Sequence, residues 1–350
     1  MWQVPKTVVV TGASAGVGRS VVLEFGRQGS NVALLARGEG RLNSAAQDAR
    51  RLGVKALPIV VDVADAAAVD AAAEQVEREL GPIDIWVNVA MVTVFAPVHA
   101  IEPEEFKRVT EVTYLGQVHG TLAALKRMRR RNQGTIIQIG SALSYRAIPL
   151  QSAYCAAKFA VRGFTDSLRT ELQHEGSQIR VTMVQLPAVN TPQFDWARNR
   201  MPKKAQPLAP IFQPEAIARE VVRAARLTPR ELWIGRSALK AIIGTLLAPR
   251  LGDEILATEG YAGQLASEPP EDGPDNLFQP PPGDPGAHGR FDGRSNPVVY
   301  GFNPLWLRAG AFAALLGAIA GAFMIGRSVS DGSASRHGAA VVSSWARRKS

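Results

Sequence analysis

The chain has 350 residues, of which 46% are hydrophobic and 20% charged, and its formal net charge is +9. This composition excludes a chain that is disordered throughout, because the apolar side chains suffice for a large core. It also excludes a protein with several membrane spans, because only one long uncharged apolar run occurs. A single cysteine, Cys155, excludes an intrachain disulfide and a cysteine-rich zinc module, and it fits a reducing compartment. The length predicts two units of about 150 residues each.

The positive charge is unevenly distributed along the chain. Residues 264–303 carry six acids and two bases, whereas residues 304–350 carry six bases and one acid. The densest basic patch, residues 126–131, has five Lys and Arg side chains but neither aromatic residues nor a nucleic-acid-binding motif. We therefore expect a solvated helix end at this patch, and no nucleic acid partner.

Seven Val- and Ile-rich runs alternate with amphipathic stretches over the first 235 residues. The runs are continuously apolar, which is typical of strands buried on both faces. The predicted strands are Lys6–Thr11, Asn31–Ala36, Lys55–Val61, Ile83–Val89, Gly134–Gly140, Gln178–Gln185 and Glu231–Ile234, and the predicted helices include Ala66–Leu80, Glu104–Arg131, Ser152–Gln173 and Pro214–Leu227. This order predicts an α/β fold with a doubly wound parallel sheet of about seven strands, covered by helices on both faces. The first strand begins almost at once, so we expect no secretory signal peptide.

A glycine-rich turn follows the first predicted strand and opens a helix. Small residues there let the backbone turn tightly and approach a pyrophosphate, which the N-terminus of the helix stabilises. The candidate cofactor-binding residues of this turn are Gly12, Ser14, Gly16, Val17 and Gly18. Their position directly after the first strand predicts a dinucleotide site.

The end of the second predicted strand indicates which dinucleotide binds. An acidic residue there would accept hydrogen bonds from the ribose hydroxyls of NAD, but this strand runs into Arg37. A guanidinium group suits the 2′-phosphate of NADP. The alternative is a solvated arginine at the start of a helix, so we predict that NADP(H) is preferred and NAD(H) is possible. Asp62 and Val63, after the third strand, are candidates for the adenine edge.

Tyr154 and Lys158 lie four residues apart on a predicted helix, so their side chains share one face. A tyrosine ionises near pH 10 in water, and a neighbouring ammonium group with an oxidised nicotinamide would lower this pKa. The pair is therefore a candidate acid/base near neutral pH. The spacing alone is common, but Ser141 ends the fifth predicted strand thirteen residues before Tyr154 and makes the set specific.

In their order and register, these motifs resemble the short-chain dehydrogenase/reductase family over about residues 5–235. The resemblance implies a Rossmann fold and hydride transfer between a nicotinamide and a carbonyl or alcohol. It implies that Tyr154 is the catalytic acid/base and that Ser141 hydrogen-bonds the substrate oxygen. Lys158 would bind the nicotinamide ribose and lower the pKa of Tyr154.

The sequence departs from the family pattern near the cofactor. The family's Asn-Asn-Ala-Gly after the fourth strand is Asn88-Val89-Ala90-Met91 here, which keeps Asn88 and Ala90 as candidate cofactor residues. The family's Pro-Gly after the sixth strand is Pro187-Ala188, and Thr191 is left near the position of the cofactor's carboxamide.

The third departure concerns catalysis. The position at which the family usually has an asparagine that organises water is Thr113. A threonine hydroxyl forms hydrogen bonds, but it is shorter and lacks the paired donor and acceptor of an amide. Thr113 is therefore a candidate catalytic residue whose proton relay behind Lys158 is in question.

Beyond the predicted catalytic domain, residues 1–260, the composition changes. Within that domain, Ser237–Ala257 is predicted to be a moderately apolar helical segment, which either packs on the domain or lies on a membrane surface. Residues 261–303 are rich in proline and glycine and have few aliphatic side chains. Such a segment buries too little surface to offset its ordering entropy, so we predict a flexible, disordered linker.

The last part of the chain contains the long apolar run. We predict a transmembrane helix over residues 304–326 and a basic tail over residues 327–350. Ala309–Ile325 has 17 residues without a charge, and the preceding Leu305–Leu307, with a snorkelling Arg308, extend it toward a hydrocarbon core of about 30 Å. The alternative is a buried helix of the globular domain.

The predicted anchor leaves its orientation open. A cytoplasmic catalytic domain would place the basic tail across the membrane, against the positive-inside tendency. Gly317 and Gly321 form a pair of small residues that permits close helix contact. The family resemblance implies a homodimer that forms through residues 105–131 and 152–174. Contact between the glycine faces of two apolar helices would reinforce this dimer.

Three further features have plain alternatives. Cys155 adjoins the tyrosine, but we expect a small buried helix residue rather than a redox group. The five histidines show no ligand spacing, so no metal site is predicted. Pro192–Phe212 falls where the family has its substrate loop; it is either a lid for an apolar substrate or irregular packing.

Together these features predict a membrane-associated, NADP(H)-dependent oxidoreductase that interconverts a secondary alcohol and a ketone or aldehyde, with its catalytic domain in the cytoplasm. The substrate is expected to be small and apolar. The competing hypothesis is an NADP(H)-binding sensor or scaffold that has lost its chemistry, which Thr113 and Met91 favour and the Ser141, Tyr154 and Lys158 set opposes.

Overall fold

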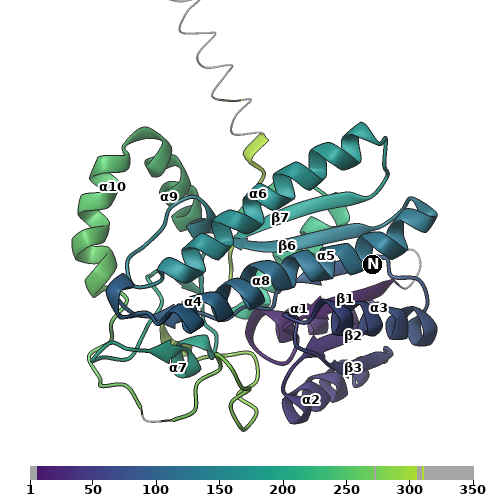
Figure 1. Cartoon of the computed structure of the whole chain (residues 1–350), viewed down its shortest axis with the longest axis horizontal. Coiled ribbons are helices and arrows are strands. Elements are labelled where there is room, and N and C mark those ends of the chain that lie inside the picture. Colours follow the sequence, from purple (N-terminus) through teal and green to yellow (C-terminus); the bar gives the residue numbers. More distant parts are fainter. Residues whose placement is uncertain (1–5, 272, 306–309, 311–350) are drawn as a thin grey trace, which may run out of the picture. The chain divides into compact units, whose positions relative to one another are not determined.

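The computed structural model describes residues 6–271, 273–305 and 310. The described residues up to Phe302 belong to one compact unit, and those from Asn303 onward to a second. The first unit contains the sheet and the helices that Figure 1 labels.

An eight-stranded sheet forms the centre of the first unit. Its order is β13-β11-β7-β6-β4-β1-β2-β3, and every pairing is parallel except that of β13 with β11. The strands are β1 (Thr7–Thr11), β2 (Asn31–Ala36), β3 (Ala56–Val60), β4 (Ile85–Asn88), β6 (Thr135–Ser141), β7 (Arg180–Leu186), β11 (Glu231–Ile234) and β13 (Gly301–Phe302). All seven predicted strands are therefore confirmed as the parallel part of the sheet, with ends that move by at most two residues. The sequence did not predict the eighth, antiparallel strand.

Ten α-helices are present in the described part of the chain. They are α1 (Gly16–Arg27), α2 (Glu39–Arg50), α3 (Ala66–Leu80), α4 (Pro103–Thr110), α5 (Gly116–Met128), α6 (Ser152–His174), α7 (Gln193–Trp196), α8 (Pro214–Leu227), α9 (Gly235–Leu247) and α10 (Pro249–Ile255). A π-helical turn, Glu111–Leu115, joins α4 to α5, so the predicted helix Glu104–Arg131 is continuous but irregular. Short strands form two small sheets, β5 (Val94–Phe95) with β9 (Arg198–Asn199), and β8 (Ala188–Val189) with β10 (Ile211–Phe212) and β12 (Ser295–Asn296).

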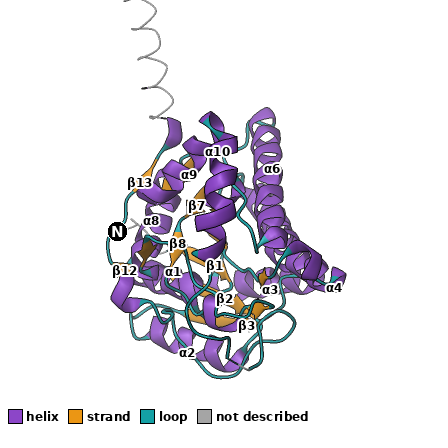
Figure 2. Cartoon of the chain, turned by 90° about the vertical axis from the view of Figure 1, so that its left-hand side faces the viewer, coloured by secondary structure: helices purple, strands orange, loops and turns teal. Residues whose placement is uncertain are grey.

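Helices cover the large sheet on both faces, as the continuous apolar strands predict (Figure 2). One buried cluster joins the sheet to α1, α2 and α8, and includes Phe25, Leu42 and Ile217. The other joins it to α3, α4, α5 and α6, and includes Val69 and Leu168. The fold is therefore a Rossmann-like α/β fold with a mostly parallel sheet.

The prediction of a flexible linker over residues 261–303 is wrong for the strap, as we call residues 273–302. Leu277 is fully buried and Phe291 is 3% exposed. The strap also contributes β12 to a small sheet and β13 to the edge of the large one. The few apolar side chains of the strap are sufficient to order it, because its backbone also forms hydrogen bonds to the domain. A count of aliphatic residues does not include these hydrogen bonds.

The predicted transmembrane helix, residues 304–326, and the basic tail lie almost wholly outside the described residues. Within residues 6–271 and 273–305, no helix combines the length and the apolar character that a membrane crossing requires. Ser237–Ala257, which we expected to be helical, forms α9, α10 and the start of a π-helical turn.

Close packing of α5 against β4 depends on one glycine. A Cβ atom on Gly120 would lie 2.2 Å from Oδ1 of Asn88 and 2.6 Å from Nε1 of Trp86. Both of these side chains are fully buried, so neither has room to move away. Gly163, in the middle of α6, has no atom within 4 Å of the same position.

We predict that Gly120→Ala lowers the free energy of unfolding by about 1–3 kcal/mol, because the added methyl group overpacks a rigid polar site. Gly163→Ala is the matched control and should leave stability unchanged or raise it by about 1 kcal/mol or less, since alanine is the better helix former. Urea denaturation of the two variants measures the difference. Equal effects in the two variants would contradict the packing argument.

Candidate active site

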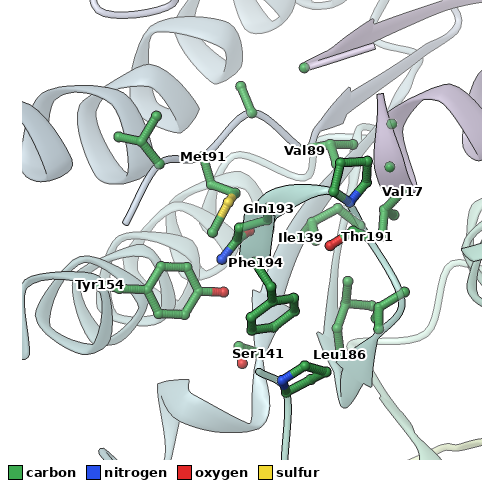
Figure 3. A pocket seen from close by; sticks show the side chains of 18 of the residues that line it. Val17, Val89, Met91, Ile139, Ser141, Tyr154, Leu186, Thr191, Gln193 and Phe194 are labelled. Carbon is green, nitrogen blue, oxygen red and sulfur yellow. The ribbon is translucent and has the colours of Figure 1, made fainter. Parts of the chain in front are cut away.

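A cavity of about 470 Å³ opens at the carboxyl ends of the parallel strands. It lies where the strand order reverses, between β1 and β4, because successive strands run outward from this point in opposite directions. Crevices at such switch points are the usual ligand sites of open α/β sheets. The cavity extends from the glycine-rich turn after β1 to the N-terminal part of α6 (Figure 3).

The glycine-rich turn has the geometry that a pyrophosphate requires. Gly12 and Gly16 have φ angles of +67° and +55°, which favour glycine, and a Cβ on Gly18 would lie 2.1 Å from the carbonyl oxygen of Gly12. Helix α1 begins at Gly16, and no side chain caps its N-terminus. The N–H of Gly16 donates to the carbonyl oxygen of Gly286 in the strap at 3.2 Å. The N–H groups of Val17 and Gly18 and the helix dipole remain for an anion, so these residues fit a dinucleotide.

The end of β2 presents positive charge to the same cavity. Arg37 and Arg41 both line it, and neither forms a salt bridge within the described ranges. Asp62 also lines the cavity, but its carboxylate pairs with Arg108 and accepts the Ala64 N–H group at 3.0 Å. Burial raises the pKa of Asp62, but these hydrogen bonds and Arg108 outweigh it, so the pKa is lower than usual.

Ser141 and Tyr154 face each other across the reactive end of the cavity. Ser141 is the last residue of β6, and Tyr154 lies in the first turn of α6. Figure 3 shows the tyrosine ring directed into the cavity, with Met91, Gln193 and Phe194 around the same space. Burial raises the pKa of the tyrosine hydroxyl well above its usual value, and a hydrogen bond with Ser141 acts in the opposite direction.

Lys158 is 1% exposed, and its Nζ atom donates to the carbonyl oxygen of Ile139 at 2.7 Å. Burial lowers the pKa of this amine to about 7. The lowering of the Tyr154 pKa by Lys158 together with an oxidised nicotinamide stays a prediction. Desolvation dominates at both groups, and Nζ lies 5.5 Å from the centroid of the tyrosine ring.

Thr113 does not line the cavity but fixes one of its walls. Its hydroxyl donates to the Val92 carbonyl at 2.8 Å and accepts the Val92 N–H at 3.0 Å. Thr113 lies in the π-helical turn, a distortion that is common at functional sites. Because its hydroxyl proton is used by Val92, the structure gives Thr113 a positioning role, and among the described residues it forms no hydrogen bond with Lys158.

Gln117, one turn later, is the polar side chain that approaches the lysine. Its Nε2 atom donates to the same Ile139 carbonyl at 3.1 Å, and its buried Oε1 atom has no partner in the described part of the chain. Sequence reasoning missed this residue, since no motif contains it.

Asn88 also lies behind the cavity and not in its lining. Its Nδ2 atom donates to Oε1 of Gln138 at 2.9 Å and to Thr121, and its Oδ1 atom accepts from Nε1 of Trp86 at 2.8 Å. With both ends of the amide used inside the fold, Asn88 stabilises the sheet and α5. The expectation of a direct cofactor contact is therefore not met in this structure.

The other predicted site residues are brought together by the fold. Those that line the cavity are Gly12, Ser14, Gly16, Val17, Gly18, Arg37, Asp62, Val63, Ala90, Ser141, Tyr154, Lys158, Pro187 and Thr191. Cys155 is 2% exposed, and burial raises the pKa of its thiol to about 11. It packs as a small core residue.

Apolar side chains make up much of the cavity lining. Met91 and Phe194 lie near Tyr154 (Figure 3), and the lining also includes Leu143, Ile148, Leu208, Ala241 and Leu256. Phe194 and Trp196 belong to the predicted substrate loop and line the cavity, whereas Met201 and Phe212 of the same loop are buried outside it. The loop is ordered by α7 and by the pairing of β9 and β10 with other segments.

Sequence reasoning missed the strap residues of the site. Asn276, Pro280 and Pro281 line the cavity beside Arg37. The available signal was Leu277, an aliphatic residue next to Phe278 in a segment otherwise dominated by proline, glycine and acids.

The chain is similar to known oxidoreductases in sequence and in structure. A family described as short chain dehydrogenase matches residues 6–201. The uncharacterized oxidoreductase YxnA of Bacillus subtilis is 32% identical over 266 residues, which cover 75% of each chain. The 3-dehydrosphinganine reductase of Danio rerio is 32% identical over 62% of this chain and 68% of its own, and the 17-beta-hydroxysteroid dehydrogenase 13 of Rattus norvegicus is 33% identical over 62% and 70%.

A solved structure with the same fold is the alcohol dehydrogenase of Thermococcus sibiricus in complex with 5-hydroxy-NADP. It has 27% sequence identity and a TM-score of 0.56 over 66% of this chain and 96% of its own. The NAD+-bound xylitol dehydrogenase has 29% identity and a TM-score of 0.50 over 53% and 70%.

The fold and the site define an oxidoreductase that acts on CH–OH groups with a nicotinamide cofactor. The chain belongs to the short-chain dehydrogenase family.

The buried lysine predicts a pH-dependent difference in stability. Its folded pKa of about 7 lies below the unfolded value of about 10.4, so its unfavourable contribution is complete below pH 7 and disappears as the pH rises through this window. The free energy of unfolding of Lys158→Met should therefore exceed that of the wild type by the largest amount at pH 6. This difference should shrink by about 1 kcal/mol per pH unit between pH 7 and 9. Denaturation of the cofactor-free protein measures this, with the exposed Lys240→Met as control. A stability difference between Lys158→Met and the wild type that does not change with pH would contradict the lowered pKa of Lys158.

Proposed function

We propose that the protein is an NADP(H)-dependent oxidoreductase that interconverts an apolar ketone or aldehyde and the corresponding alcohol. The observation that carries this proposal is the juxtaposition in one cavity of a partly buried Tyr154, an apolar lining near its hydroxyl and an arginine pair at the far end.

When bound, the nicotinamide cofactor supplies or accepts a hydride. The residues of the chain manage the proton. The Tyr154 hydroxyl is protonated at neutral pH and can donate its proton to a carbonyl oxygen, as reduction requires. Burial raises its pKa and makes it a weaker donor, so the positive charge of Lys158 would be needed to lower that pKa. Ser141 lies beside that hydroxyl and would hold the same oxygen in place, and Lys158 would bind the nicotinamide ribose.

The preference for NADP(H) rests on charge. Arg37 and Arg41 line the cavity without a carboxylate partner in the described segments, and Asp62 is neutralised by Arg108. A 2′-phosphate would compensate the buried positive charge, whereas a ribose hydroxyl would not.

The apolar substrate rests on the lining of the reactive end and on Phe194, which contacts Phe95 and Phe291 at centroid distances of 6.0 and 5.8 Å. The names of two relatives, a 3-dehydrosphinganine reductase and a 17-beta-hydroxysteroid dehydrogenase, agree with a lipid-like or steroid-like substrate class.

We predict that purified protein oxidises NADPH in the presence of long-chain or cyclic ketones, and that NADH is a poorer cofactor. Tyr154→Phe should lower kcat at least 100-fold, because it removes the proton donor and leaves the packing intact. Binding of NADPH, followed by its fluorescence, should change less than threefold and serves as the control.

Two results would contradict the proposal. NADPH binding without turnover of any ketone would favour the sensor or scaffold, which Met91 in the cavity and the engaged hydroxyl of Thr113 permit. Turnover that survives Tyr154→Phe would remove the tyrosine from the chemistry.

We also propose that the protein associates with membranes and forms a homodimer. Support for the membrane comes from the apolar sequence run 309–325 and from exposed side chains on α9 and α10, namely Leu246 (70%), Leu247 (79%), Leu251 (56%) and Ile255 (45%). Support for the dimer comes from exposed apolar side chains on α4, α5 and α6, namely Phe106, Leu122 and Phe159.

We predict that full-length protein floats with liposomes and that a chain ending at Asn303 floats much less. The shortened chain should keep its unfolding transition, because the compact unit extends to Phe302. A chain ending at residue 260 is the contrasting control and should be unstable, since it lacks the strap. Full-length protein that stays in the aqueous phase without detergent would exclude the anchor.

A further inference from the structure

Three consecutive carbonyl groups of the strap converge on the guanidinium of Arg37. Its Nη2 atom donates to the Asn276 oxygen at 2.6 Å, and its Nη1 atom donates to the oxygens of Phe278 at 3.0 Å and Leu277 at 3.3 Å. The partners lie about 240 residues away in the sequence. This turn, Asn276–Phe278, and Arg37 meet at the edge of the dinucleotide cavity.

The carbonyls orient this guanidinium without neutralising it. An arginine has five N–H donors, so three bonds leave two hydrogens, one of them on Nε. Nε has no partner within residues 6–271 and 273–305, and Arg37 forms no salt bridge there. Arg37 therefore presents a full positive charge and two unused donors in a fixed orientation.

The turn is itself held in place from several directions. The Leu277 side chain is fully buried in the cluster that contains Val61 and Val63. The carboxylate of Asp275 accepts the Leu277 N–H at 2.9 Å and binds Nε of Arg198 at 2.7 Å. Nε of Arg108 donates to the Leu277 carbonyl at 3.1 Å. The turn is thus a rigid support for Arg37.

A further group points to a ligand beside this turn. The Oδ1 atom of Asn276 is buried and has no hydrogen-bond partner in the described part of the chain, and Asn276 lines the cavity. An unpaired buried acceptor is costly, and a donor on a bound ligand would satisfy it. Adenosine carries such donors in its amino and hydroxyl groups.

We infer that the turn Asn276–Phe278 of the strap is a specificity-determining element, which holds Arg37 so that its two unused N–H groups bind the 2′-phosphate of NADP(H). The inference rests on the proposed NADP(H) preference. Asn276, Leu277 and Phe278 act through Arg37 and are positioning residues. A C-terminal segment thereby sets the cofactor selectivity of a strand end near the N-terminus.

The test compares two adenosine fragments on the full-length protein by calorimetry, 2′,5′-ADP and 5′-ADP. Leu277→Ala removes the anchor of the turn. It should reduce the preference for 2′,5′-ADP by about tenfold and change the affinity for 5′-ADP less than twofold, since a loosened guanidinium loses the 2′-phosphate alone. Val298→Ala, elsewhere in the strap, is the control; its side chain is 56% exposed, and the affinities for both fragments should stay unchanged.

A double-mutant cycle separates positioning from general damage to the site. Arg37→Ala should abolish the preference for 2′,5′-ADP. Adding Leu277→Ala to Arg37→Ala should then change nothing further, because the turn acts only through this arginine. If the turn has only a structural role, Leu277→Ala will weaken the binding of both 2′,5′-ADP and 5′-ADP, with or without Arg37→Ala. That result would overturn the inference.

A second variant covers the case in which Leu277→Ala fails to fold. Asp275→Ala deletes the acceptor of the Leu277 N–H group without opening a core cavity, and the same selective loss is expected. An unchanged preference in these variants would overturn the inference, and so would an increased preference, which would mean that the strap carbonyls compete with the phosphate.

The wild type separates this inference from the proposed function. If the wild type prefers 2′,5′-ADP and reduces ketones while the variants keep the preference, the role of the turn alone is wrong. If the wild type binds both fragments equally, the NADP(H) preference and the inference are wrong together, whereas ketone reduction in the same preparation still decides the reaction.

Discussion

Everything at the site depends on where the parallel sheet changes direction. From β1, the chain proceeds outward to β2 and β3, and from β4 it proceeds outward on the other side, so a crevice is unavoidable between the two carboxyl ends. The glycine at position 12 lets β1 turn there, since a Cβ atom on it would lie 2.7 Å from the Cα atom of Ala90. The helix N-terminus, the arginines and the Ser141–Tyr154 pair are all placed by this divergence, because each follows the end of a strand that reaches the same edge.

Desolvation is the second force that shapes the site. The same desolvation that raises the pKa of Tyr154 lowers the pKa of Lys158 to about 7. The hydrogen-bond acceptor of the lysine is a neutral carbonyl oxygen and not a carboxylate, so no negative charge offsets the desolvation. A group that binds beside the lysine would therefore change its pKa. The protonation states of Tyr154 and Lys158 thus depend on burial and on the bound cofactor, and the four-residue spacing in the sequence does not predict them.

The large sheet, its helices and most of the cavity lining follow from sequence patterns. Buried strands have continuous Val and Ile runs, and the residues that follow them are bound to share an edge, which is why Gly12, Arg37, Ser141 and Tyr154 are found together. Asn88 and Thr113 show where such reasoning ends. Their positions were predicted, but whether an amide or a hydroxyl faces the cavity or the interior depends on partners such as Gln138 and Val92. The order of the strap was not predicted, because it depends in part on hydrogen bonds that its backbone carbonyls accept from Arg37. Amino-acid composition carries no information about such bonds.

The strap also ends in β13, which pairs in antiparallel orientation with Trp233 and Ile234 of β11. Without it, β11 would be a bare edge strand with unpaired N–H and C=O groups, and such edges recruit other chains. One segment therefore supports the arginine at one end of the sheet and closes the hydrogen-bonding edge at the other. Proteolytic cleavage within the strap would couple two losses that are normally separate, since cofactor selectivity and resistance to edge-to-edge aggregation would fail together.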